Sequence, residues 1–375
     1  MIDRLITPVV QKALIDSKQI VILYGARQTG KTTIASEIIR QFKGKVLQVN
    51  GDELKYADIL SSRNFDQINL LIDGYDLLFI DEAQRIPDIG LNLKIIHDRM
   101  PQLKILVTGS SSFDLAQKLA EPLTGRTLTY KLYPIALAEL RAGMSIFELK
   151  QSLQTLMIYG MYPALHSITN ASDKEKQLIE LSTSYLYKDI FELSSIRNAS
   201  KIRDLLRMLA FQVGAEVSIP ELSQNLSMSQ ETVNHYIDLL EKAFIIYRLG
   251  AFSGNLRKEI SKKCKVYFWD TGIRNSLINN FAGFTYRNDT GALWENFVVS
   301  ERLKCLSYNN MNATSYFWRT YTGAEIDYME EYNGKYKALE IKMKNKGIKP
   351  PKTWTDLYGT DFNLIQPENF HEFLI

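Results

Sequence analysis

The sequence has few cysteines, little net charge and no long apolar run, and each shortage excludes a class of protein. Cys264 and Cys305 are the two cysteines among 375 residues, too few for a disulfide framework or a cysteine zinc site, so a reducing compartment is expected. The 45 Lys and Arg residues exceed the 42 Asp and Glu residues by three, too small an excess to indicate a nucleic-acid partner by itself. No stretch is long and apolar enough to cross a membrane or to act as a signal peptide. The sequence therefore predicts a cytoplasmic protein without a membrane partner.

Linkers and repeats are also lacking. We find no internal repeat, low-complexity tract or long Pro, Gly or Ser linker, and the four histidines are scattered. A chain of 375 residues nevertheless exceeds the usual size of a single core. Two or three domains are expected, and their limits must come from changes in residue pattern.

A glycine-rich loop follows the first buried strand pattern. Residues 20–33 read IVILYGARQTGKTT, which is a strand, a Gly-x4-Gly-Lys-Thr loop and the start of a helix. In such a loop the backbone N–H groups and the helix N-terminus face phosphates, the lysine reaches the β and γ phosphates, and the threonine ligates Mg²⁺. The expected nucleotide-binding residues here are Gly25, Ala26, Arg27, Gln28, Thr29, Gly30, Lys31, Thr32 and Thr33.

A second apolar strand pattern ends in two adjacent acids. Residues 76–84 read DLLFIDEAQ, as expected of a buried parallel strand. Asp81 is expected to hold Mg²⁺ through water, and Glu82 to polarise the water that attacks the γ phosphate. Together with the glycine-rich loop, this pair predicts ATP and Mg²⁺ as ligands and Lys31 and Glu82 as catalytic residues.

Two further positions have open alternatives. A third strand, residues 104–112, ends in hydroxyl side chains, so Thr108 and Ser110 either sense the nucleotide or cap the next helix. Arg126 begins another strand and is either an arginine finger for a neighbouring subunit or a surface ion-pair partner. Arg27 is a weaker second candidate for the finger.

These motifs together resemble those of AAA-type ATPases. More narrowly, GARQTGKTT, FIDEAQ, TGSSSF and the later LTGR and YPI are similar to a prokaryotic family in which an AAA-like ATPase domain precedes an uncharacterised C-terminal domain. The resemblance implies an α/β fold with a five-stranded parallel sheet between helices, ATP hydrolysis, and a ring-like homo-oligomer in which Arg126 acts in trans. We expect the ATPase core at residues 1–145 and a helical lid at residues 146–200.

Residues 201–280 have three helical patterns followed by strand patterns, which is typical of a winged helix-turn-helix. The start of the third helix would then read bases of double-stranded DNA, and the following basic stretch, which includes Lys265, would contact phosphates. The alternative is a winged helix that serves only for packing and a lysine-rich strand that is simply solvated. The candidate DNA contacts are Gln230, Thr232, Asn234, His235, Arg257, Lys258, Lys262 and Lys263.

A hairpin near the C-terminus brings two acids together. If residues 333–334, Asn-Gly, form a two-residue primed turn, cross-strand partners have numbers that sum to 667, and Asp327 faces Glu340. Facing carboxylates are tolerated when one is protonated or a cation lies between them. On this register Glu325 and Lys342 share that face, whereas the core face takes Ile326, Tyr328, Leu339 and Ile341.

The spacing of Asp327, Glu340 and Lys342 resembles that of restriction-endonuclease-like nucleases. The resemblance implies that the two acids hold a metal ion, that Lys342 orients the attacking water, and that Glu295 adds an outer ligand. We therefore expect a nuclease-like α/β domain at residues 281–375. The alternative is an ordinary half-exposed strand with alternating charge.

Two functions remain open from the sequence. The first is a DNA-directed ATPase, with nuclease activity possible. The second is a nucleotide-dependent switch or scaffold that binds protein partners, of the signalling or defence type, without nucleic acid.

Overall fold

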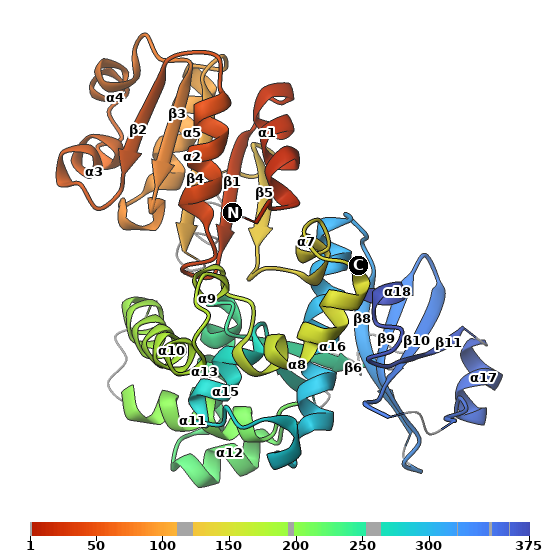
Figure 1. Ribbon diagram of the computed structural model, residues 1–375. Helices are drawn as coiled ribbons and strands as arrows, with labels where there is room; N and C mark the ends of the chain where they lie inside the picture. Colours follow the sequence, from red (N-terminus) through yellow and green to blue (C-terminus); the bar gives the residue numbers. More distant parts are fainter. Residues whose placement is uncertain are drawn as a thin grey trace.

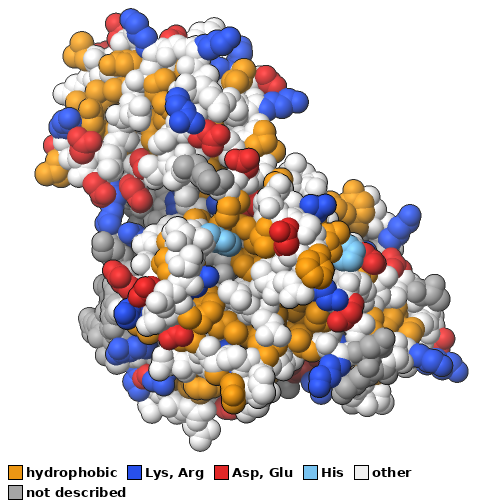
Figure 2. Space-filling view, viewed as in Figure 1, with side chains coloured by type: hydrophobic (Ala, Val, Ile, Leu, Met, Phe, Trp, Pro, Cys, Tyr) orange, Lys and Arg blue, Asp and Glu red, His pale blue; other side chains and the backbone are white. Residues whose placement is uncertain are grey.

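A parallel α/β lobe lies above a larger lobe of helices and a mixed sheet in the computed structural model (Figure 1). The structure describes residues 2–110, 123–193, 199–252, 264–320, 322–344, 347–359 and 361–375. For the described residues between 184 and 199, it describes the backbone alone. The space-filling view shows the notch between the lobes (Figure 2). Within the described ranges, no helix is both long and apolar enough to cross a membrane.

The first lobe contains a five-stranded parallel sheet in the order β2-β3-β4-β1-β5. This confirms the parallel sheet expected from the resemblance. The strands are β1 (Ile20–Gly25), β2 (Val46–Asn50), β3 (Leu77–Asp81), β4 (Lys104–Ser110) and β5 (Thr127–Leu132).

Helices cover both faces of this sheet, because the strand side chains that point to either face are apolar and need to be buried. In β1, Ile20 and Ile22 face one core, and Val21 and Leu23 face the other. The first core is covered by α3 (Leu54–Ser61), α4 (Phe65–Ile72) and α5 (Ile89–Arg99), and the second by α1 (Ile6–Asp16) and α2 (Lys31–Gln41). A short 3-10 turn, η1 (Ala83–Arg85), follows β3.

A helical segment connects the two sheets. Serine side chains cap three of its helices, since Ser145, Ser218 and Ser229 each accept a backbone N–H three residues ahead. The helices are α7 (Leu137–Leu140), α8 (Ile146–Tyr159), α9 (Pro163–His166), α10 (Ala171–Leu193), α11 (Ala199–Phe211), α12 (Ile219–Leu226) and α13 (Gln230–Lys242).

The second sheet has six strands in the order β11-β10-β9-β8-β6-β7. The antiparallel pair β6 (Ile246–Ala251) and β7 (Cys264–Phe268) joins it through a parallel contact between β6 and β8 (Thr314–Arg319). The sheet therefore continues across residue 280, where the sequence predicts a domain boundary. Its other elements are α15 (Thr271–Leu277), η2 (Phe284–Tyr286), α16 (Thr290–Tyr308), β9 (Glu325–Tyr332), β10 (Lys335–Ile341), α17 (Lys352–Tyr358), β11 (Phe362–Ile365) and α18 (His371–Leu374).

The β9–β10 hairpin has the expected turn and register. Asn333 and Gly334 have φ angles of 51° and 74°, as a type I′ turn requires. The paired positions run from Lys335 opposite Tyr332 to Leu339 opposite Tyr328, each with the predicted sum.

An irregularity between β8 and β9 changes which face the next residues take. It lies between Tyr316 and Trp318, and a β-bulge of this kind turns the following side chains to the other face. Ile326 consequently packs in the cluster of Trp318, while Tyr328 packs in the main core. The expectation that Ile326 and Tyr328 share one face is therefore wrong.

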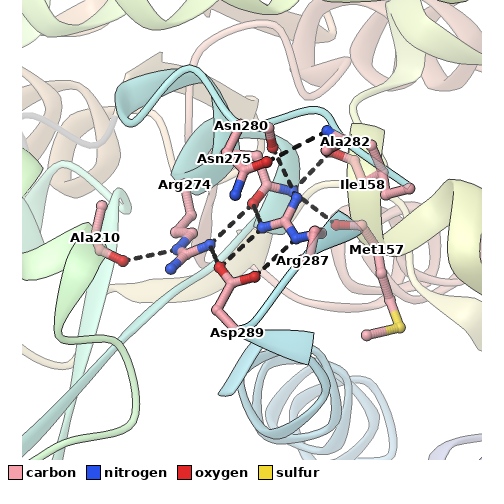
Figure 3. A network of polar contacts seen from close by, with 9 residues as sticks. All are labelled: Met157, Ile158, Ala210, Arg274, Asn275, Asn280, Ala282, Arg287 and Asp289. Atoms are coloured by element: carbon pink, nitrogen blue, oxygen red, sulfur yellow. Dashed lines mark hydrogen bonds and ion pairs between the residues drawn. The ribbon is translucent and has the colours of Figure 1, made fainter. Parts of the chain in front are cut away.

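A buried polar network holds four helices of the larger lobe together (Figure 3). Asp289, just before α16, accepts hydrogen bonds from Arg274 and Arg287. Arg274 also donates to the carbonyl of Ala210 in α11 at 2.7 Å, and Asn275 donates to two carbonyls near the end of α8. Arg274 is 1% exposed, so α8, α11, α15 and α16 meet around paired charges with almost no access to water.

Candidate nucleotide site and carboxylate cluster

The glycine-rich loop lies between β1 and α2, at the carboxyl end of the sheet. Gly25 ends β1, where a Cβ would come within 2.0 Å of the carbonyl oxygen of Leu132, so a side chain is excluded. Gly30 has a φ of 99° and caps α2, a conformation that glycine adopts at little cost. The ammonium of Lys31 donates to the carbonyls of Gly25 and Ala26 at 2.9 and 2.7 Å. The Lys31 ammonium is therefore bound by carbonyl groups of its own loop.

Asp81 joins the loop to the end of β3. Thr32 Oγ1 donates to Asp81 Oδ2 at 2.9 Å, and Thr108 on the neighbouring strand β4 donates to Asp81 Oδ1. Thr108 therefore orients Asp81. Its alternative, a helix cap, concerns residues 111–122, which lie outside the described ranges.

Glu82 is held by a residue that the sequence reasoning missed. Gln84 Nε2 donates to Glu82 Oε2 and, at 2.9 Å, to Ser110 Oγ. Glu82 has a φ of 50°, which turns the chain sharply into η1. In the sequence, the one sign that Gln84 belongs to the site is its position two residues after Glu82. Its contact with Ser110 could not be predicted, because that contact depends on how β3 and β4 pair.

Two cavities flank the loop. The larger, about 620 Å³, is lined by loop residues, Glu82, and Pro163, Glu180 and Leu181 from α9 and α10. The smaller, about 420 Å³, shares Gly30 and Thr33 with the larger one and is largely apolar. Both volumes are in the range of small-ligand sites. The lining residues of the smaller cavity include Ile2, Arg4, Ile135, Pro163 and His166.

A second polar cluster lies on the hairpin of the larger lobe. Lys342 Nζ is 2.8 Å from Asp327 Oδ2 and 2.8 Å from Glu340 Oε1, and the backbone N–H of Ile341 donates to Asp327 at 2.9 Å. Burial and the charge of Asp327 raise the pKa of Glu340. The cation between the two facing acids is thus the lysine of the same hairpin.

Lys265 completes this cluster from β7. Its ammonium is 3.2 Å from Glu295 Oε1 on α16 and 2.8 Å from Glu325 Oε1, and Tyr267 donates to Glu295 at 2.6 Å. Burial, together with the charge of Asp327, raises the pKa of Glu295 to about 6 although Lys265 opposes the shift. Lys265 is 3% exposed, so its expected role as a surface phosphate contact is wrong.

Comparison with known proteins assigns three consecutive regions. Residues 17–141 match the family model described as AAA domain, and residues 150–283 and 290–366 match two domains of unknown function, DUF8612 and DUF4143. Among curated proteins, uncharacterized protein Rv2008c of Mycobacterium tuberculosis is 30% identical over 331 residues, which cover 86% of this chain and 70% of Rv2008c. The chain belongs to the same family as Rv2008c, and its AAA domain makes it a P-loop ATPase.

Two further similarities cover most of the chain. Uncharacterized protein MJ1544 of Methanocaldococcus jannaschii is 26% identical, with 89% of this chain and 80% of MJ1544 covered. The solved Walker-type ATPase PABY2304 of Pyrococcus abyssi has a TM-score of 0.50 at 14% identity, covering 74% of this chain and 96% of that one, which shows a shared fold. The expected order, an AAA-type domain before an uncharacterised C-terminal region, is confirmed.

Arg126 of the ATPase lies at the opposite end of the sheet from its own loop. Ile20 pairs with Thr127 and Gly25 pairs with Leu132, so about five residues of strand, or roughly 16 Å, separate Arg126 from the loop. Its Nε donates to Asp98 at 2.8 Å. Arg126 therefore does not serve the site of its own subunit, and its action on a neighbouring subunit stays a prediction.

The first two turns of α13 present polar side chains. Gln230, Asn234 and His235 are exposed, and Thr232 is half-buried with its hydroxyl 2.8 Å from that of Ser229. The apolar side of α13 faces the core. The other candidate DNA contacts, Arg257, Lys258, Lys262 and Lys263, lie outside the described residues. On the face in Figure 2, described basic and acidic side chains are interspersed over both lobes.

The expected metal site on the hairpin is not assembled. Across the described part of the chain, no three His, Cys, Asp or Glu side chains converge closely enough to hold a metal ion. Asp327, Glu340 and Glu295 do lie in one cluster, but the ammonium groups of Lys342 and Lys265 lie between its carboxylates.

Proposed function

We propose that this ATPase binds and hydrolyses Mg-ATP at the loop between β1 and α2. The observation that carries the proposal is the contact between Thr32 and Asp81, because it joins a hydroxyl and a carboxylate next to a phosphate-binding loop. Both groups are oxygen ligands of the kind that Mg²⁺ uses, directly or through water. The residues present therefore fit the ion.

Each residue then has a role in hydrolysis. Lys31 exchanges the carbonyls of Gly25 and Ala26 for phosphate oxygens and balances their charge, and the loop N–H groups hold the remaining oxygens. Glu82, oriented by Gln84, accepts a proton from the attacking water. When bound, Mg²⁺ neutralises the charge that develops on the phosphates.

The nucleoside part of ATP occupies the smaller cavity. Its apolar lining suits a purine, and it adjoins Gly30, so one nucleotide spans both cavities. Pro163 lines both of them, and burial lowers the pKa of His166, which favours the neutral ring beside a base. This placement supports a lid function for the helices that follow residue 145.

The Mg²⁺ assignment predicts a specific defect in Thr32→Ala. Removing the hydroxyl that contacts Asp81 is expected to raise the Mg²⁺ concentration for half-maximal hydrolysis by about 10-fold or more. Thr33→Ala removes the neighbouring hydroxyl of α2 and is the matched control, because any effect should fall on ATP affinity and leave the Mg²⁺ requirement unchanged. Equal Mg²⁺ dependence in both variants would show that Thr32 does not serve the ion.

For the larger lobe we propose duplex DNA as the ligand. Three helices followed by the β6–β7 pair have the order of a winged helix-turn-helix, and the polar start of α13 is exposed, as a base-reading helix would require. In this proposal the hairpin binds DNA without cleaving it, because the ammonium of Lys342 lies between Asp327 and Glu340, where a metal ion would have to bind. Cleavage would require Lys342 to leave this position for a metal ion.

DNA binding predicts a salt-dependent interaction. The affinity of the full chain for a short random-sequence duplex is expected to fall steeply between about 50 and 200 mM salt. A double exchange, Gln230→Ala with Asn234→Ala, should weaken it, whereas Gln151→Ala, an exposed glutamine of α8, should not. Absence of binding at low salt would favour the alternative function, a nucleotide-dependent switch or scaffold for protein partners. A homo-oligomeric ring with Arg126 acting in trans and a cytoplasmic location stay predictions.

A further inference from the structure

The buried side chain of Arg4, in the N-terminal segment, contacts the glycine-rich loop and also lines the smaller cavity. Arg4 Nη1 donates to the carbonyl oxygen of Thr29 at 2.6 Å, Nη2 to the carbonyl oxygen of Tyr133 at 2.7 Å, and Nε to Glu139 Oε1 at 3.0 Å. The Arg4 side chain is 8% exposed and that of Glu139 is fully buried. One guanidinium thus joins the loop, the end of β5 and α7.

This contact orients a peptide group of the loop. The C=O and N–H of a planar trans peptide point in opposite directions, so a donor that holds the Thr29 carbonyl directs the Gly30 N–H away from Arg4. The side chain of Thr29 is occupied as well, since its hydroxyl donates to the carbonyl of Ala26 at 2.8 Å. Arg4 therefore keeps the Gly30 N–H available for a phosphate.

The polar contacts continue from Glu139 into the larger lobe. Glu139 Oε2 accepts the N–H of Ala136 at 2.9 Å, and the next N–H, of Leu137, donates to Glu301 Oε2 at 2.7 Å. Lys304 donates to Glu301 Oε1 at 2.6 Å, and both side chains are completely buried. An unbroken chain of contacts consequently runs from the loop carbonyl to α16.

Helix α16 joins this chain to the carboxylate cluster. Glu301, Lys304 and Tyr308 are spaced for one face of the helix, and all three contact residues 133–137 at the end of β5. The same helix carries Glu295, about two turns before Glu301. Glu295 is paired with Lys265 of the carboxylate cluster. In Figure 1 the end of α16 lies beside α7 at the junction of the lobes.

We propose that Arg4 is a positioning residue for the nucleotide site and that, through Glu139 and Glu301, it couples occupation of the loop to α16. The proposal rests on nucleotide binding at that loop. Its physical basis is that separating a buried charge from its partner costs much free energy. If the loop moves and displaces Arg4, Glu139 and residues 135–137 must therefore move with it. Coupling of this kind is reciprocal, so ligands of the larger lobe also change nucleotide affinity.

The chain contains a convenient reporter for this coupling. Its four tryptophans, Trp269, Trp294, Trp318 and Trp354, all follow residue 264, outside the AAA domain at residues 17–141. Trp294 is on α16, and Trp269 packs on Tyr133 with ring centroids 4.6 Å apart. Saturating the full wild-type chain with Mg-ATPγS should change tryptophan fluorescence with a midpoint equal to the Kd measured by calorimetry.

Two variants separate positioning from coupling. Arg4→Met should raise the Kd for Mg-ATPγS by about 10-fold or more and abolish the fluorescence change at saturation. Glu301→Gln leaves the contact between Arg4 and Thr29 in place, so it should change the Kd far less than Arg4→Met does but lose most of the fluorescence change. Arg302→Met is the matched control, because Arg302 is a buried arginine of the same helix that pairs with Glu330, and its fluorescence change should persist.

The outcomes distinguish this proposal from the proposed function. A wild-type chain that binds no Mg-ATPγS contradicts the nucleotide site itself and the coupling with it. Binding without a fluorescence change, or a full change in both Arg4→Met and Glu301→Gln, contradicts the coupling alone. An unchanged Kd in Arg4→Met overturns the positioning role. Circular dichroism of each variant identifies misfolded protein, and Glu301→Gln, which is isosteric, tests the coupling if Arg4→Met does not fold.

Discussion

Exchanging Glu82 for glutamine is expected to slow ATP hydrolysis by roughly 100- to 10,000-fold, the usual contribution of a positioned general base. ATP binding should remain, because Glu82 lines the larger cavity and contacts Gln84 but is not among the loop residues that would hold the phosphates. Glutamine has the same shape and can still accept the hydrogen bond from Gln84. The exchange should therefore slow the hydrolysis step alone: kcat for phosphate release should fall, and the Kd for ATP should stay the same.

Lys31→Ala supplies the matched contrast for Glu82→Gln. It removes the ammonium that lies inside the loop, so it should lose affinity for ATP as well as turnover. Calorimetric titration with ATP and a phosphate-release assay on both variants distinguish the two effects. If Glu82→Gln hydrolysed ATP at the wild-type rate, another residue would have to activate the water.

A large loss of stability is expected for Asp289→Asn. Asp289 accepts from Arg274 and Arg287, which are 1% and 8% exposed, and removing one partner of a buried ion pair costs about 3–5 kcal/mol of unfolding free energy. We expect about 3 kcal/mol, the lower limit, because the Asp289 side chain is 18% exposed. Urea unfolding at neutral pH measures this difference.

The same exchange removes a dependence on pH. Burial alone would raise the pKa of Asp289, but the hydrogen bonds from Arg287 and Arg274 outweigh burial and lower the pKa to about 2. The carboxylate thus stabilises the fold above its unfolded pKa near 4, and this contribution disappears as the pH falls toward 2. The difference between wild type and Asp289→Asn should shrink over that interval. Asp173→Asn, in an exposed pair with Lys176, is the control and should cost less than about 1 kcal/mol.

The loop and Asp81 could be predicted because each belongs to a short motif that is recognisable on its own, although Thr32 and Asp81 are 49 positions apart. The loop is one uninterrupted segment between a strand and a helix, and Asp81 follows directly from a continuous apolar strand. Parallel pairing then brings the ends of β1 and β3 to one edge of the sheet. The hairpin register could be predicted for a similar reason, since a two-residue Asn-Gly turn determines every pair that follows.

Contacts between distant residues that no motif marks could not be predicted. Arg4 and Glu139 are separated by 135 positions, and no local pattern indicates that they meet next to the loop. Lys265 looked like part of a solvated basic stretch, because nothing in the sequence indicates that β6 and β7 join the sheet of the hairpin. The bulge that separates Ile326 from Tyr328 likewise arises from pairing between strands.

The central claim is that the loop between β1 and α2 hydrolyses ATP, and the rate of phosphate release from Mg-ATP tests it most directly. We predict measurable turnover by the purified wild-type chain that is abolished by chelating Mg²⁺ and by Lys31→Ala. Turnover at the wild-type rate in Lys31→Ala, or no turnover by the wild-type chain with Mg²⁺ present, would contradict the account.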